Sequence, residues 1–180
     1  MRVRPYKSMM LSPNFNIDEI VSPNYIDDLT SSQYEMLEYL CFNILEPMRD
    51  FAHDLFGRDC PVTITSGLRT MSDYYDLIRT GYRPSQKSDH FFGAVPETCG
   101  AVDLCLSQGT DTFFWALSKT YKNGMLHIRG EAIDFGQIIL EKNKTFWIHV
   151  SNPGEIFGIK KRTKNKIMVS IDNGKTYKNV

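Results

Sequence analysis

Residues 135–151 read FGQIILEKNKTFWIHVS, and this stretch decides the fold because two apolar segments flank a short polar turn. We expect strands over Phe135–Glu141 and Thr145–Ser151, joined as a hairpin by the Lys-Asn-Lys turn between them. His149 lies in the middle of the second strand, where its imidazole must point either into the core or into a cleft. The stretch therefore predicts antiparallel pairing around a polar residue.

Further strands are expected on both sides of this hairpin. Pro61–Thr65 and Ala101–Leu106 are short apolar or β-branched segments, and the second contains Asp103. A carboxylate in the middle of an apolar strand is costly without a partner, and a bound metal ion would offset that cost. Near the C-terminus, Asn173-Gly174 between β-rich segments predicts a tight hairpin. These strands are expected over 167–172 and 175–177.

A long apolar stripe between Ser31 and Gly57 predicts the main helix. Ser32 and Glu35 have the spacing of a capping box, and Pro47 predicts a kink or a break within the stripe. Shorter helices are expected over 15–24, 71–80 and 110–121.

The order of these elements predicts the fold class. Helices come first and strands later, without regular βαβ alternation, which favours an α+β fold with N-terminal helices packed on a small antiparallel sheet. The length of 180 residues suits one domain. We divide the chain into a lead-in over 1–14, a domain over 15–152 and a C-terminal β-hairpin extension over 153–180.

Composition excludes several classes of function. The formal net charge is zero, which gives no reason to expect a nucleic-acid partner, and no segment is apolar for long enough to span a membrane. The basic cluster over 160–166 is best interpreted as a solvated loop or hairpin. No apolar segment of a secretory signal follows the N-terminus. The cysteines are expected to be free thiols: Cys41, Cys60, Cys99 and Cys105.

Three residues could form a metal site. His90 ends a polar loop, whereas Asp103 and His149 interrupt apolar strands. Two imidazoles and one carboxylate, with a fourth position open to water, are the ligands of a hydrolytic zinc site. Spacing alone does not select this set, because a chain with four histidines and many acids offers several combinations. His53 and His127 are interpreted as structural histidines.

Several short motifs resemble those of one enzyme family, in the same order along the chain. Ile64–Arg69 resembles "ITSGxR", Ser88–Gly93 resembles "SxHxxG", and Gly100–Leu104 resembles "GxAxDh". The segments of residues 135–151 resemble the closing "FDQLIxE…WIHVS". Together with weaker matches near Phe15 and Pro47, they are similar to the zinc D-Ala-D-Ala carboxypeptidase and L-Ala-D-Glu endopeptidase family of murein peptidases, which includes many phage endolysins.

The resemblance implies roles for individual residues. The zinc ligands fall on His90, Asp103 and His149, and the general base for the attacking water falls on Glu141. The family's substrate-binding arginine falls on Arg69, which can pair with a peptide carboxylate. Ser88 and Trp147 are further candidate substrate-binding residues.

The implied function is zinc-dependent hydrolysis of peptide bonds in peptidoglycan stem peptides, by a phage lysin or a virion-associated wall-degrading component. Such a protein would be made in the cytoplasm and act on the cell wall after lysis or from a phage particle, where the C-terminal hairpin could contact other virion proteins. The alternative is a non-catalytic phage structural or wall-binding protein that keeps the peptidase fold.

The chain departs from the family pattern in two places. Twelve residues separate His90 from Asp103 where the family has six, which indicates an insertion over Ala94–Cys99. A surface loop absorbs such an insertion at little cost, but we expect it to stand beside the metal, where Glu97 or Cys99 could compete as a ligand. Many relatives also carry the base two or three residues before the last ligand, where this chain has Phe146 and Trp147.

Overall fold

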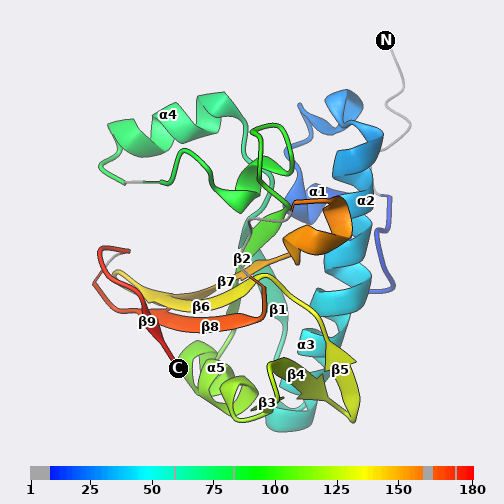
Figure 1. The fold of residues 1–180 in the computed structure, drawn as a ribbon, viewed down its shortest axis with the longest axis vertical. Coiled ribbons are helices and arrows are strands. Elements are labelled where there is room, and N and C mark those ends of the chain that lie inside the picture. Colours follow the sequence, from blue (N-terminus) through cyan, green and yellow to red (C-terminus); the bar gives the residue numbers. More distant parts are fainter. Residues whose placement is uncertain (1–8, 59, 83, 160–163, 173) are drawn as a thin grey trace.

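The computed structural model describes residues 9–58, 60–82, 84–159, 164–172 and 174–180, and it combines helices with two sheets (Figure 1). The helices are α1 (Ile17–Ile20), α2 (Ser31–Leu40), α3 (Glu46–Phe56), α4 (Met71–Arg79) and α5 (Thr110–Ser118). The main sheet has the order β1-β2-β7-β6-β8-β9, with β1 (Val62–Ser66), β2 (Ala101–Leu106), β7 (Phe146–Ser151), β6 (Gln137–Lys142), β8 (Lys166–Ser170) and β9 (Lys178–Asn179). The smaller sheet contains β3 (Tyr121–Lys122), β4 (Met125–Ile128) and β5 (Glu131–Ile133).

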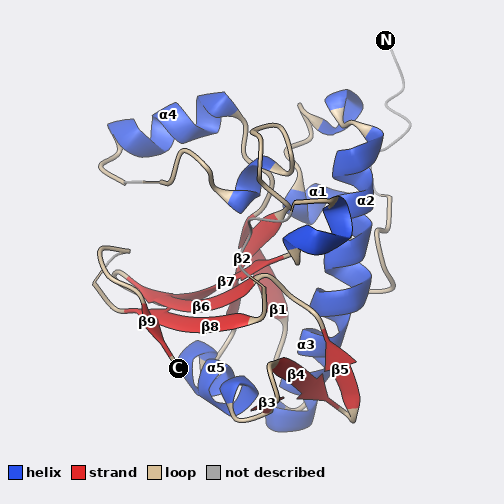
Figure 2. Ribbon diagram, in the orientation of Figure 1, coloured by secondary structure: helices blue, strands red, loops and turns tan. Residues whose placement is uncertain are grey.

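The mixed α+β class is confirmed, and so are the strands of the deciding stretch. β6 and β7 pair antiparallel, and β2 pairs antiparallel with the other edge of β7. The β6–β8 pair is parallel, so the expectation of a wholly antiparallel sheet is wrong. The residues assigned to a C-terminal extension thus continue the central sheet beside β6 (Figure 2).

The C-terminal hairpin differs from the two-residue turn expected at Asn173-Gly174. The ladder pairs Met168 with Asn179, so the second strand begins later than the expected 175–177. The carboxylate of Asp172 accepts hydrogen bonds from the backbone N–H groups of Lys175 and Thr176, and these bonds hold a wider loop. Asn173 itself lies outside the described residues.

The long helical segment is continuous but not regular. A π-helical turn over Cys41–Leu45 joins α2 to α3, and Pro47 lies just after it, where the regular i→i−4 hydrogen bonding is already interrupted. The capping box uses Thr30 and Gln33 rather than Ser32 and Glu35, so the helix starts slightly earlier than expected. Gly57, with φ 86°, ends the segment as predicted.

The other helices follow the sequence pattern with shifted ends. Asn16 caps α1 through a capping box with Glu19, and α4 covers nearly the whole segment predicted to be helical. α5 ends at Ser118, because Tyr121 turns into β3. The four cysteines are free thiols, as expected. Among the described residues, no helix is both long and apolar enough to cross a membrane.

The two faces of the main sheet have different surroundings. On one face the paired residues are apolar and buried in the core that includes α2, α3 and α5: Val102, Leu104, Ile138, Leu140, Ile148 and Val150. On the opposite face, the strands present Asp103, His149 and Glu141, which line a cleft. Because side chains alternate along each strand, one set of strands supplies both the core and the floor of the cleft.

Candidate metal centre

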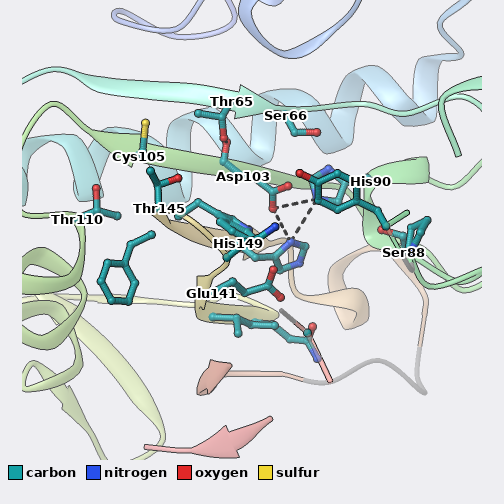
Figure 3. Close-up of a pocket in the computed structure, with 18 of the residues that line it drawn as sticks. Thr65, Ser66, Ser88, His90, Asp103, Cys105, Thr110, Glu141, Thr145 and His149 are labelled. Carbon is teal, nitrogen blue, oxygen red and sulfur yellow. Dashed lines mark hydrogen bonds and ion pairs between the residues drawn. The ribbon is translucent and has the colours of Figure 1, made fainter. Parts of the chain in front are cut away.

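Three residues from different segments converge at the floor of the cleft. His90 belongs to a short 3-10 turn over Asp89–Phe91, whereas Asp103 and His149 are directly paired across β2 and β7. His90 Nε2 lies 3.2 Å from Asp103 Oδ1 and 3.2 Å from His149 Nδ1, and His149 Nδ1 lies 3.1 Å from Asp103 Oδ1 (Figure 3). The structure thus brings together the three residues that the sequence predicted as ligands.

This triangle fits a tetrahedral metal ion. Ligand atoms about 2.0 Å from a tetrahedral zinc ion lie about 3.3 Å from one another, close to the separations seen here. His90 Nδ1 donates to the carbonyl oxygen of Gly67 at 2.7 Å, so the lone pair of Nε2 faces the other two atoms. A buried His90–Asp103–His149 group can therefore hold a metal ion.

Burial and the mutual interactions of the three side chains shift their pKa values in different directions. Burial lowers the pKa of His90. Burial would raise the pKa of Asp103, but the charge of His90 and the hydrogen bonds to both histidines hold that pKa well below its ordinary value. Burial alone would lower the pKa of His149, yet its hydrogen bond to Asp103 and the charges of Asp103 and Glu141 raise it. The Asp103 carboxylate therefore favours a positive charge beside it, and a bound metal cation would supply one.

Arg69 holds the second oxygen of the aspartate. Its Nη2 donates to Asp103 Oδ2 at 2.7 Å, and its Nε and Nη2 donate to the hydroxyl of Ser66. A register irregularity between Ile64 and Ser66 in β1 places Ser66 opposite Asp103. Arg69 therefore orients a candidate ligand, and its predicted binding of a substrate carboxylate stays a prediction.

The turn after β1 is fixed between α1 and the His90 segment. Arg69 N–H donates to His90 O, and Leu68 N–H donates to Ile20 O. A Cβ on Gly67 would lie 2.0 Å from Ile20 O, so this position accepts only glycine. Glycine at position 67 therefore allows the turn to approach α1 closely. In this position the Gly67 carbonyl oxygen accepts the hydrogen bond from His90 Nδ1.

We expected the insertion over Ala94–Cys99 to stand beside the metal centre, and this expectation is wrong. The end of the insertion is bound to Asp89, which lies before it: Asp89 Oδ1 accepts from the Cys99 N–H, and Asp89 O accepts from the Gly100 N–H. Cys99 Sγ lies 3.1 Å from the carbonyl oxygen of Asn152, and Glu97 pairs with Lys87 at 2.6 Å. No residue from 94 to 99 lines the cleft, so neither Glu97 nor Cys99 competes as a ligand.

The cleft contains the other predicted site residues. It has a volume of about 1790 Å³ and extends from the end of α4 across β7 and β6 to the C-terminal loop. Ser88, Trp147 and Glu141 all line it. Glu141 lies two positions after Ile139, which pairs with His149, so Glu141 is on the same face of the sheet as the histidine and its carboxylate points towards it (Figure 3). Burial raises the pKa of Glu141.

Tyr177 is a cleft residue that the motifs did not indicate. Its hydroxyl donates to Glu141 Oε1 at 3.1 Å, from a segment beyond the last motif. The sequence signal nearest to it was the β-rich C-terminal segment, which predicted a hairpin but gave no indication that Tyr177 would reach the cleft.

Comparisons of the chain with protein-family models, with curated proteins and with solved structures each find no match. The function proposed below therefore depends on the motifs of the chain and the geometry of its site.

Proposed function

We propose that this chain is a zinc-dependent peptidase that hydrolyses peptide bonds in the stem peptides of bacterial peptidoglycan. The observation that supports it best is the near-equilateral triangle of His90 Nε2, Asp103 Oδ1 and His149 Nδ1 at the floor of an open cleft. Three protein ligands leave a position for water and substrate, whereas structural zinc sites are usually closed by four.

The residues around the triangle suit hydrolysis. A bound zinc ion would supply Lewis-acid polarisation of the scissile carbonyl and lower the pKa of water to about 7. Glu141, on the same face of the sheet as His149, would accept the proton of the attacking water and return it to the leaving amine. Burial raises the pKa of Glu141, which brings the carboxylate closer to the range in which it both accepts and donates protons.

The choice of substrate depends on the motifs as well as the cleft. The strings around Arg69, His90, Asp103 and His149 resemble murein peptidases, and the cleft, with a volume of about 1790 Å³, has room for a peptide. We further propose that the protein is a phage lysin or a virion-borne wall-degrading component. Peptidoglycan stem peptides are then its main partner.

The test combines metal content with product analysis. Purified protein should bind about one zinc ion per chain, and mass spectrometry of digested peptidoglycan should identify a cleaved stem-peptide bond. Glu141→Gln removes the proton acceptor without touching the triangle, so it should keep the metal and cut about 10²- to 10⁴-fold more slowly. Retained zinc with no cleaved bond in any peptidoglycan would favour a wall-binding protein, and absence of zinc binding would contradict the proposal.

A further inference from the structure

The C-terminal segment returns to the candidate site. β8 lies alongside β6, and the chain after it crosses to the cleft before β9 pairs back with β8. Tyr177 lines the cleft at the end of this loop, and its hydroxyl reaches Glu141 Oε1 at 3.1 Å. A residue 36 positions further along the chain thus contacts the carboxylate that the motifs mark as the general base.

The loop that carries Tyr177 is held in place by one carboxylate. Asp172 accepts from the hydroxyl of Ser170 at 3.0 Å, and its two oxygens accept from the backbone and the hydroxyl of Thr176 at 3.0 and 2.6 Å. These hydrogen bonds lower the pKa of Asp172 to about 2, so the carboxylate stays charged at neutral pH. Beyond the loop, Val180 N–H donates to Ile167 O at 3.0 Å, which anchors the end of the chain.

The contact suits a role in positioning. A glutamate has three side-chain torsions, and a hydrogen bond to one oxygen restricts them while other lone pairs of the carboxylate stay available to water. Burial raises the pKa of the Tyr177 phenol, so the hydroxyl stays protonated and can only donate to the carboxylate. Hydrogen bonds from Tyr177 and from the Trp147 side chain both offset part of the rise in the pKa of Glu141 that burial causes. The Tyr177 hydroxyl therefore holds one oxygen of the Glu141 carboxylate from a segment beyond β8.

We propose that Tyr177 is a positioning residue that holds the Glu141 carboxylate for proton transfer, and that the loop after β8 is therefore part of the active site. This inference rests on the proposed peptidase function. It assigns to the C-terminal segment a role within the site itself, in addition to any contact with other proteins.

The experiment measures kcat and KM of the full-length, zinc-loaded protein on isolated muropeptides. Tyr177→Phe keeps the ring and removes only the hydroxyl, so kcat should fall about 10- to 100-fold, as expected for loss of one hydrogen bond to a charged group, while KM and zinc content stay unchanged. Asp172→Ala should lower kcat in the same way, because it releases the loop. Tyr75→Phe is the matched control, since Tyr75 is similarly exposed but lies outside the cleft.

A double variant tests whether Tyr177 acts through Glu141. With enzyme in excess, Glu141→Gln/Tyr177→Phe should be no slower than Glu141→Gln alone. Unchanged kcat in Tyr177→Phe, a change in KM alone, or effects that multiply in the double variant would each overturn the inference. If the zinc-loaded unmodified protein cuts no muropeptide, both the proposed function and this inference are wrong. If that protein is active and Tyr177→Phe leaves its kcat unchanged, only the inference is wrong.

Discussion

Adjacent residues of β7 belong to two different environments. Ile148 is fully buried in the apolar core, whereas His149 faces the cleft and completes the triangle of candidate metal ligands. The same contrast holds in β2, where Leu104 packs in the core beside Asp103. The core face needs only dense apolar packing, but the cleft face needs particular atoms at particular separations. The two faces therefore differ in how a substitution should act, although they share one backbone.

The largest expected effect is on the cleft face. His149→Ala removes one of three ligand atoms, so zinc content should fall from about one per chain to near zero and peptide cleavage should fall to background. The free energy of unfolding of the metal-free protein should change less than in Ile148→Ala. Metal analysis, a muropeptide assay and urea unfolding in chelator measure the three quantities. Full activity in His149→Ala would contradict the assignment of the site.

The matching change on the core face should have the opposite signature. Ile148→Ala leaves a cavity at a fully buried position, and we expect it to lower the free energy of unfolding by about 2–5 kcal/mol. The fraction that stays folded at low temperature should still bind zinc. Urea unfolding, with metal content measured on the folded protein, checks this. A stable Ile148→Ala protein that has lost its metal would show that the two faces are not separable.

A smaller effect on metal affinity is expected for Arg69, which binds the Asp103 oxygen that is not one of the three candidate ligand atoms. Arg69→Gln removes the 2.7 Å ion pair with Asp103 Oδ2, and loss of such an outer partner usually costs about 10- to 100-fold in metal affinity or activity. Competition with a chromophoric chelator measures the affinity. Arg79→Gln on exposed α4 is the control, because Arg79 pairs with Asp76 away from the triangle. Equal affinities in the two variants would mean that Arg69 serves the substrate rather than the ligand.

The smallest effect should come from a site remote from both faces. Thr30→Ala removes the N-cap of α2 and should cost about 1 kcal/mol of stability, with no change in zinc affinity. Thr30→Ser keeps the hydroxyl and should recover most of that loss. Thermal unfolding of the three proteins, followed by circular dichroism, gives the comparison. A shift in zinc affinity would indicate that the helix end couples to the site.

Much of the fold could be predicted from local patterns. The apolar segments on either side of a polar turn predicted β6 and β7, and the apolar stripe predicted α2 and α3, because those signals lie within a few residues of one another. The parallel pairing of β8 with β6 could not be predicted, because it joins segments far apart in sequence and depends on which sheet edge stays free. The wider C-terminal loop was missed for a local reason, since the Asp172 carboxylate competes with the backbone for the same N–H groups.

The sequence by itself supplied several histidines and acids that could bind a metal, and the resemblance of its motifs to one peptidase family selected His90, Asp103 and His149 among them. Only the tertiary structure decided that their ligand atoms meet at separations of 3.1–3.2 Å, that the insertion stays away from them, and that Arg69 and Tyr177 reach the Asp103 and Glu141 carboxylates. The physical reason is that residue type sets the chemistry of a side chain, whereas its partners are set by strand register and loop closure across the whole fold.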